Sequence, residues 1–324
     1  MWAVDTGGTK THGVLADATG KVLTEQKGGP CNLFMQGEDG CYRVLADLLS
    51  ATCAAARITS QQIDCAFVAL GGLDTDADRR DFNKKMALIF AGTSIRWQLE
   101  NDVLAALYSG TLGEPGIVLL AGTGSMAMGQ AVDGSIYRCG GWGQLINGDP
   151  GSAYDTGRRL LAHVLHGHDA NLVPDQLTLM AMAASGASSA AGVIDWVKNA
   201  ESPSASVAAL SKVVGHAAQE GNLIAQQLLK ASAEAMVQHL GIVAARMGQM
   251  PQPVPVVLAG GMFRSSHYLA TVEELLNNDT GCWKAVVPTM PPVGGSYVGA
   301  LRLAGVPVTD DVLARFTSEL VKSR

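Results

Sequence analysis

The sequence predicts an α/β fold built from two halves of similar design. Residues 2–4 and 11–16 form predicted strands joined by a short turn of small residues, and the same pattern returns at 117–121 and 126–130. After each opening set of strands, apolar segments alternate with segments of helical periodicity, which indicates a mixed sheet covered by helices. With 324 residues, the chain is long enough for two domains of ordinary size.

The composition excludes several classes of protein. Hydrophobic residues make up 48% and charged residues only 16% of the chain, which argues against disorder. A net charge of -6 without a dense Lys/Arg stripe argues against a nucleic-acid binder. The six cysteines are scattered and form no Cys-x-x-Cys pair, so we expect them to act as small buried hydrophobic residues. Because we find neither signal-peptide zones nor an apolar run of ~20 residues, we expect a soluble cytoplasmic protein that does not enter membranes.

The first half is predicted to open with three antiparallel strands. The first strand ends on Asp5, and the turn Thr6–Thr9 leads into the second. The remaining elements expected here are a hairpin at 14–25, a loop at 28–32, a helix at 39–56, a strand at 65–70, a helix at 76–90, a strand at 95–99 and a helix from Asp102 to Ser109. The turn 110–116 marks the expected domain boundary.

The second half repeats the opening and then becomes largely helical. The elements expected here are strands at 117–121, 126–131 and 136–139, a glycine-rich loop at 140–151, a helical region at 152–247, a break at Pro251–Pro255, a strand at 256–259, a helix at 265–276, a strand at 284–287 and helices at 296–304 and 310–322.

The two small-residue turns have the composition of phosphate-binding turns. Gly7 and Gly8 allow positive φ and close approach of another backbone or a ligand. Successive backbone N–H groups in such a turn can form a concavity for an anion. Asp5 stands where it could hold a divalent cation, through water, against bound phosphates. A plain hairpin with a polar tip is the simpler alternative, but the recurrence at Gly122–Ser125 favours a duplicated, phosphate-binding design.

Five motifs along the chain occur in the order of a known family. They are Asp5-Thr-Gly-Gly-Thr-Lys10, Gly29-Pro-Cys-Asn32, Asn101-Asp102, Ala121-Gly-Thr-Gly-Ser125, and Gly140-Gly-Trp-Gly143 continuing to Gly148-Asp-Pro-Gly-Ser152. With these motifs the sequence resembles the N-acetylglucosamine kinase branch of the BadF/BadG/BcrA/BcrD ATPase family, within the superfamily of actin, sugar kinases and heat-shock ATPases. The resemblance spans essentially the whole chain.

The resemblance implies a two-domain ribonuclease H-like (actin-like ATPase) fold with a cleft between the domains. The N-terminal domain would be 1–112, joined by a C-terminal helix at 308–324, and the C-terminal domain would be 113–307. It also implies an ATP-dependent, magnesium-dependent kinase that phosphorylates the 6-hydroxyl of N-acetylglucosamine or glucosamine, working as a homodimer on small molecules.

The resemblance assigns nucleotide contacts to both turns and to a third loop. Asp5 would position the metal. The implied ATP-binding residues are Gly7, Gly8, Thr9, Lys10, Gly122, Thr123, Gly124, Gly260, Gly261 and Ser265. For the third loop, a plain strand-to-helix turn remains the alternative.

Asp102 is the strongest candidate for a catalytic residue. It follows a strand and precedes a helix, so the structural alternative is a capping role at the helix start. The resemblance instead makes Asp102 the base that orients the sugar hydroxyl and accepts its proton.

Further sugar contacts are implied by the resemblance, each with a structural alternative. Asn32 could contact the sugar or form an Asx-type turn. Trp142 could offer an aromatic platform or plug the edge of the core. The remaining implied contacts are Ser125, Gly141, Gly143 and Asp149. Pro150 replaces the usual Glu, and Asp149 lies one residue further from Trp142 than in the family, which leaves the preferred sugar open.

Three other interpretations compete with the kinase. His163, His166 and His168 could share a helix face and bind zinc, or lie at a solvated helix end. The same family includes ATPases that activate 2-hydroxyacyl-CoA dehydratases through a shared iron–sulfur cluster, which requires suitably placed exposed cysteines. A sugar sensor without catalysis is disfavoured by the presence of both Asp5 and Asp102.

Overall fold

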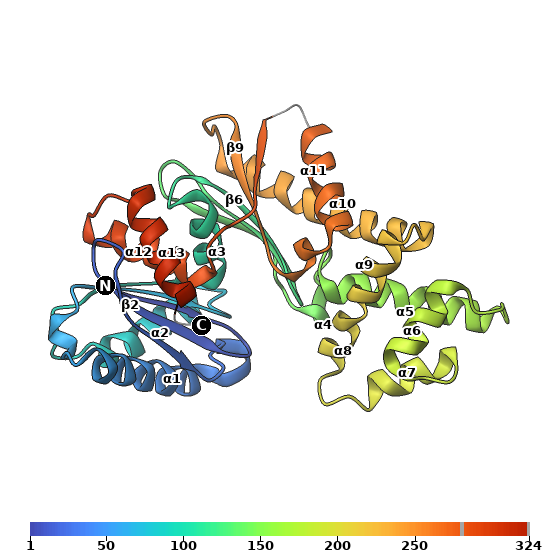
Figure 1. Cartoon of the computed structure of the whole chain (residues 1–324), viewed down its shortest axis with the longest axis horizontal. Coiled ribbons are helices and arrows are strands. Elements are labelled where there is room, and N and C mark those ends of the chain that lie inside the picture. Colours follow the sequence, from blue (N-terminus) through green and yellow to red (C-terminus); the bar gives the residue numbers. More distant parts are fainter. Residues whose placement is uncertain (279–281, 323–324) are drawn as a thin grey trace. The chain divides into compact units, whose positions relative to one another are not determined.

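The computed structural model describes residues 1–278 and 282–322, and its chain forms two compact units. Unit 1 comprises Met1–Glu114 and Pro288–Arg324, and unit 2 comprises Pro115–Val287. Each unit contains a five-stranded mixed sheet with helices packed on it (Figure 1). The predicted α/β class is therefore confirmed. The domain bounds and the cleft implied by the family stay predictions.

The sheet of unit 1 has the strand order β3-β2-β1-β4-β5. Its strands are β1 (Trp2–Thr6), β2 (Thr11–Ala16), β3 (Val22–Gly28), β4 (Cys65–Leu70) and β5 (Arg96–Asn101). β1, β2 and β3 pair antiparallel, whereas β1, β4 and β5 run parallel. The carboxyl ends of these three parallel strands therefore share one edge of the sheet.

Helices cover both faces of this sheet (Figure 1). They are α1 (Leu33–Ala56), η1 (Ser60–Gln62), α2 (Asp76–Ile89), α3 (Asp102–Thr111), α12 (Pro292–Ala304) and α13 (Asp310–Lys322). α1 and α2 pack on one face, and α3, α12 and α13 pack on the other. α12, which we expected in the second half, thus belongs to unit 1, where it contacts β1 and α3.

Helix α1 begins earlier than the expected residue 39. Asn32 caps a first turn that starts at Leu33, and Gly37 then kinks the helix with a φ of 66°. Only the segment after this kink shows uninterrupted helical periodicity, so the sequence pattern missed the first turn.

Glycines bring α12 close to its neighbours in unit 1. A Cβ on Gly295 would lie 1.8 Å from the Ala105 carbonyl oxygen of α3, and one on Gly299 would meet the ring of Phe67. Between them, the buried Ser296 hydroxyl donates to the Val4 carbonyl oxygen of β1 at 2.9 Å. α12 therefore ties the helix that starts at Asp102 to the strand that carries Asp5.

Helix α13 packs on the antiparallel side of the same sheet. The Phe316 ring stacks on Tyr297 of α12 with centroids 4.2 Å apart. A Glu319 carboxylate oxygen accepts from the Val22 N–H at 2.6 Å, and Gly20 has no room for a Cβ against the Val312 carbonyl oxygen.

The sheet of unit 2 has the order β10-β9-β6-β7-β8. Its strands are β6 (Gly116–Ala121), β7 (Ser125–Gln130), β8 (Ile136–Gly140), β9 (Val254–Ala259) and β10 (Trp283–Val286). β6, β9 and β10 run parallel, and β6, β7 and β8 pair antiparallel. This is the same arrangement of three antiparallel and three parallel strands, with one shared strand, as in unit 1.

The expected helical region at 152–247 is divided into several helices. The helical elements of unit 2 are α4 (Gln144–Asn147), α5 (Ala153–Asp169), α6 (Gln176–Ser185), α7 (Ala190–Lys198), α8 (Pro203–Ala209), α9 (Ser211–Gln219), α10 (Leu223–Met247), η2 (Gly261–Arg264) and α11 (Ser266–Asn278). α10 packs across β6, β7 and β8, and buried residues such as Leu240 and Val243 join it to the core.

One stretch of the described residues, Gln176–Lys198, is apolar and long enough to cross a membrane by length and composition. The expectation that no such run exists was therefore wrong. The structure divides this stretch into α6 and α7, because Gly186 ends the first helix in a left-handed conformation and Ser189 caps the second.

We predict that Gly295→Ala lowers the free energy of unfolding by about 1–3 kcal/mol, because the new methyl group must displace the backbone of α3. Gly241→Ala is the matched control: Gly241 lies exposed inside α10 with nothing near its Cβ position, so it should gain about 0.5–1 kcal/mol. Urea denaturation followed by circular dichroism measures both, and a stable Gly295→Ala variant would contradict the tight α3–α12 contact.

Candidate active site

Two acidic residues lie at the shared edge of the parallel strands in unit 1. Asp5 is near the end of β1, and Asp102 opens α3 directly after β5. Burial raises the pKa of Asp5 to about 8, with the charge of Asp102 adding to the effect and Lys10 opposing it. Burial also raises the pKa of Asp102 to about 6, with Asp74 adding and backbone N–H groups opposing. At neutral pH the Asp5 carboxyl group therefore stays mostly protonated unless a cation compensates its charge, whereas Asp102 is mostly ionised.

The chemistry of this donor set fits a hard divalent cation held by one carboxylate. Within residues 1–278 and 282–322, no group of three or more His, Cys, Asp or Glu side chains could hold a metal ion. A cation beside Asp5 would thus need further oxygen ligands from water and from a bound phosphate, which is how magnesium sites at nucleotides are usually completed.

The N-cap residue of α3 is Asn101 and not Asp102. The Asn101 side-chain oxygen accepts from the Val103 N–H at 3.0 Å, and its amide nitrogen donates to the Leu73 carbonyl oxygen at 3.1 Å. Asn101 is therefore the N-cap, while the Asp102 carboxylate also interacts with the N–H groups of Val103 and of Asp102 itself, so the capping alternative holds in part. The Asp102 carboxylate is left at the helix N-terminus, where the dipole favours a negative charge.

The side-chain oxygen of Asn32 has a structural role at the start of α1. It accepts from the N–H groups of Phe34 and Met35 at 3.1 and 3.2 Å, which caps α1. The Asn32 amide nitrogen lies 3.1 Å from the position of a Cβ on Gly71, and an Asp102 carboxylate oxygen lies 3.4 Å from the same point. Glycine at position 71 thus lets a hydrogen-bond donor and an acceptor both approach its backbone closely.

The first small-residue turn is held to the sheet by its backbone. The Gly7 N–H donates to the Lys10 carbonyl oxygen, and the Gly7 carbonyl oxygen accepts from Cys31, both at 3.0 Å. Neither Gly7 nor Gly8 has a positive φ, so glycine is not needed for the backbone conformation. At Gly8, glycine instead lets a neighbour come close, since the Met35 sulfur lies 3.0 Å from its Cβ position. Gly8, Thr9 and Lys10 are exposed, as a ligand-binding turn requires.

The second turn lies at the corresponding edge in unit 2. Gly122 donates its N–H to the Gly124 carbonyl oxygen at 2.9 Å, and the Gly122 and Thr123 carbonyl oxygens accept from the first residues of α5. The buried Ser125 hydroxyl donates to the Pro150 carbonyl oxygen at 2.8 Å. This hydroxyl therefore joins the turn to the loop at 149–152.

The third predicted loop presses against the second turn. Gly260 has a φ of 106°, and a Cβ there would lie 2.4 Å from the Ala121 carbonyl oxygen and 2.9 Å from the Gly122 nitrogen. Only glycine fits this close approach at the carboxyl ends of β6 and β9. Gly261 begins η2 and is exposed, and the Ser265 hydroxyl accepts from the Tyr268 N–H at 3.4 Å at the start of α11. The nucleotide-binding residues predicted in unit 2 thus share one edge of its sheet.

The glycine-rich loop after β8 presents Trp142 and holds Asp149 inside. Trp142 is 56% exposed, so the alternative of a core-edge plug is wrong. Asp149 is buried with a left-handed φ of 44°, and its carboxylate accepts from the Gly143 N–H at 3.1 Å. The same carboxylate lies 2.7 Å from the Cβ position of Gly124. Asp149 therefore connects the two ends of the loop with the second turn.

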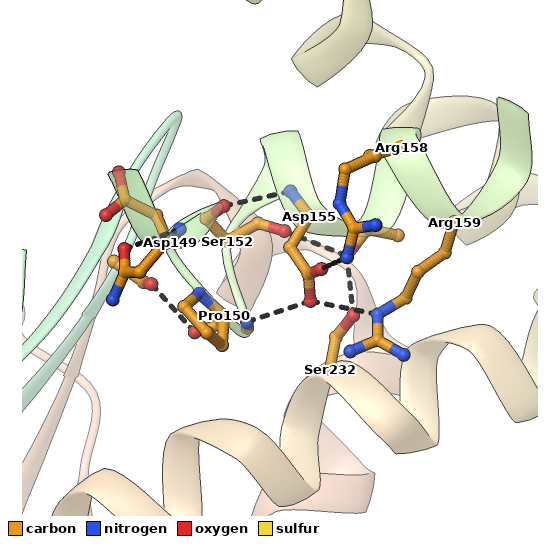
Figure 2. A network of polar contacts seen from close by, with 11 residues as sticks. Asp149, Pro150, Ser152, Asp155, Arg158, Arg159 and Ser232 are labelled. Atoms are coloured by element: carbon orange, nitrogen blue, oxygen red, sulfur yellow. Dashed lines mark hydrogen bonds and ion pairs between the residues drawn. The ribbon is translucent and has the colours of Figure 1, made fainter. Parts of the chain in front are cut away.

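A buried carboxylate that the sequence analysis missed supports this loop (Figure 2). Asp155 accepts from the Gly151 N–H at 3.1 Å and from the guanidinium groups of Arg158 and Arg159 at 2.8 and 2.9 Å. The Ser152 hydroxyl accepts from the Asp155 N–H at 3.0 Å. The Ser-x-x-Asp spacing at a helix start is a capping signal that could have revealed this network.

The histidine cluster is not joined to these residues. His163 pairs with the Asp175 carboxylate at 2.7 Å, and no metal-binding group involves it in the part of the chain described. A cavity of about 440 Å³ lies beside the three histidines, and one of about 670 Å³ is lined by residues such as Met250 and Trp283. Neither cavity is lined by a residue predicted to bind the nucleotide, the sugar or magnesium.

The sequence profile of the BadF/BadG/BcrA/BcrD ATPase family matches residues 3–304. This chain belongs to that family. The resemblance stated from the motifs is therefore confirmed, and family membership implies the use of ATP.

Two curated relatives are similar in sequence over most of the chain, and a solved structure shares its fold. The chain is 29% identical over 268 residues to the N-acetyl-D-glucosamine kinase of Dictyostelium discoideum, covering 80% of this chain and 83% of that protein. It is 27% identical over 274 residues to the N-acetylmuramic acid/N-acetylglucosamine kinase of Clostridium acetobutylicum, covering 82% and 86%. Its fold matches a Chromobacterium violaceum protein provisionally assigned as an N-acetylglucosamine kinase, with a TM-score of 0.71, 24% identity and coverage of 93% and 98%.

We predict that Asp102→Asn stabilises the protein above pH ~6. The pKa of Asp102 is about 6 in the folded state and 3.8 without the fold, so ionisation weakens the fold as the pH rises through this range. The variant should gain stability over the native chain between those values and keep a constant gain above them. Denaturant titrations across pH measure this gain.

Asp81→Asn is the control, because Lys84 lowers the pKa of that exposed carboxylate. It should show no gain with rising pH. An equal response of both variants would contradict the strained environment of Asp102.

Proposed function

We propose that this protein is an ATP-dependent amino-sugar kinase that phosphorylates the 6-hydroxyl of N-acetylglucosamine or glucosamine. The observation that carries the proposal is the Asp102 carboxylate at the shared edge of the parallel strands, where it and the Asn32 amide nitrogen both closely approach the backbone of Gly71. The names of the two curated relatives support the same class of substrate.

Asp102 is proposed as the catalytic base. With a pKa of about 6 it is largely ionised at neutral pH, yet it is a stronger proton acceptor than an ordinary Asp. The Asn32 amide nitrogen can hold the sugar in place while the Asp102 carboxylate accepts the hydroxyl proton. Phosphoryl transfer depends mainly on positioning and charge neutralisation. One oriented carboxylate is therefore a sufficient catalytic group for activating the sugar hydroxyl.

Asp5 is proposed to hold magnesium, through water, beside the phosphates of ATP. When bound, Mg²⁺ would neutralise phosphate charge during the transfer. The raised pKa of Asp5 reflects burial and the nearby Asp102, and a cation is the partner that would allow this carboxyl group to ionise. The backbone N–H groups of the turns at Gly7–Lys10 and Gly122–Gly124 are proposed to bind the phosphates, with Gly260, Gly261 and Ser265 at the adenosine.

The loop in unit 2 is proposed to supply the remaining sugar contacts. The exposed Trp142 ring suits the apolar face of a hexose. Gly141 and Gly143, both with a positive φ, flank Trp142 in the loop. Asp149 is a second acceptor for sugar hydroxyls. The Ser125 hydroxyl donates to Pro150, so we propose that Ser125 acts mainly by fixing this loop.

The proposal extends to a cytoplasmic homodimer that acts on small molecules and not on nucleic acid or membranes. The alternative, an activator carrying an iron–sulfur cluster, needs accessible cysteines. Three of the six cysteines are buried and three are half-buried, so none offers an exposed thiolate for a shared cluster.

The decisive test is a coupled ADP-release assay over N-acetylglucosamine, glucosamine and N-acetylmuramic acid. We expect turnover with at least one of the first two sugars and none with its 6-deoxy analogue, because that analogue lacks the proposed nucleophile. Turnover of the 6-deoxy sugar would place the reaction at another hydroxyl.

We predict that Asp102→Asn lowers kcat at least ~100-fold, because the amide cannot accept the hydroxyl proton. Binding of ATP, measured by calorimetry, should be retained. Asp81→Asn, on the exposed face of α2, should keep native turnover. Near-native kcat in the folded Asp102→Asn variant would refute the assignment of the base.

We predict that Asp5→Asn raises the magnesium concentration needed for half-maximal activity by about tenfold or more, since one carboxylate contact to the hydrated ion is lost. Titration of magnesium at saturating ATP measures this. An unchanged requirement would remove Asp5 from the metal site.

A further inference from the structure

Arg138 lies beneath the loop that carries Trp142. Its guanidinium carbon is 4.7 Å from the centre of the Trp142 ring, so the planar cation covers part of one face. One of its terminal nitrogens also donates to the carbonyl oxygens of Gly140 and Gly141, both at 3.2 Å. A single side chain thus contacts the aromatic ring and the backbone that leads to it.

The conformation of the loop agrees with a bracing role. Gly140 and Gly141 are consecutive residues with left-handed φ values of 79° and 72°, and their carbonyl oxygens converge on the same guanidinium nitrogen. A Cβ on Gly141 would lie 2.2 Å from the Met126 methyl group. The backbone therefore has little freedom on the β7 side, and Arg138 secures it on the other.

The identity of the residue matters for this role. Arginine can stack its plane on an aromatic ring and still donate in several directions, whereas lysine offers a point charge without a plane. Trp142 remains 56% exposed with Arg138 against it, so a ligand can still reach the indole.

We propose that Arg138 is a positioning residue that orients Trp142 for the sugar and leaves the chemistry to Asp102. This inference rests on the proposed amino-sugar kinase function and deepens it. Arg138 acts through Trp142 and the Gly140–Gly141 backbone, so its loss should weaken sugar binding and spare the transfer step.

Kinetics of variants test the proposal. Arg138→Ala should raise the KM for the amino sugar about tenfold, with kcat and the KM for ATP within about twofold. Arg138→Lys should fall between this variant and the native enzyme. In a Trp142→Phe background, Arg138→Ala should add little, because the two residues act as a pair. An unchanged sugar KM in folded Arg138→Ala would overturn the proposal. An equal rise in the KM for the sugar and the KM for ATP, together with a lower Tm, would also overturn it.

Arg246 supplies a matched control at the same sheet. Its guanidinium lies 5.3 Å from the centre of the Tyr137 ring, so it is also a stacked arginine. It donates to the Arg138 backbone carbonyl oxygen at 3.3 Å, so Arg246→Ala removes a neighbour of Arg138 and leaves the Arg138 guanidinium in the chain. Arg246→Ala should keep the native sugar KM. A rise equal to that of Arg138→Ala would overturn the specific role of Arg138.

A spectroscopic measurement separates this inference from the proposed function. Acrylamide quenching of Trp142 fluorescence, obtained by subtracting the Trp142→Phe variant from its parent, should increase in Arg138→Ala because a covered face becomes accessible. If the native protein turns over no amino sugar, the proposed function fails while this readout still decides on Arg138. Unchanged quenching would show that Arg138 does not hold the ring.

Discussion

The placement of two acidic side chains at the ends of parallel strands is the constraint on which unit 1 depends. Asp5 lies near the end of β1 and Asp102 follows β5, with β4 between those strands, so the sheet itself brings them to one edge. Their raised pKa values show that the fold holds both groups in a place that disfavours their charge. Two such groups at one edge reduce stability, and this agrees with the proposal that the edge binds a ligand.

Unit 2 meets a different requirement, which is to keep a glycine-rich loop in one conformation. The Asp149 carboxylate accepts from the Gly143 N–H within the loop, and the Asp155 carboxylate accepts from the Gly151 N–H. Arg138 donates to the Gly140 carbonyl oxygen, where the loop begins. Each contact replaces rigidity that the glycines themselves lack. The exposed Trp142 is thus carried by a segment with several independent attachments.

The sequence was sufficient for the fold class and for most elements, because the apolar periodicity of strands and helices in this chain is regular. It failed where a local feature interrupts that periodicity, as at Gly37 in α1, or where a helix belongs to a distant part of the chain, as with α12. Among the site residues, the motifs located the turns and the acidic groups. They could not distinguish the roles of Asn101 and Asp102, because either residue type can cap a helix and only coordinates show which one does. Asp155 could have been found from the Ser-x-x-Asp spacing, because that spacing is a capping signal. Arg138 lies in an ordinary strand segment, and only the fold shows that its side chain contacts the Gly140–Trp142 motif.

The discontinuity of unit 1 has a consequence for biosynthesis. Helices α12 and α13, which complete one face of the first sheet, come after all of unit 2 in the chain. During translation, the segment 115–287 is therefore synthesised in full while only α3 is present to cover that face of the sheet β1–β5. The first unit can therefore be completed only after residues 292–322 have been synthesised, which follows the synthesis of the whole second unit.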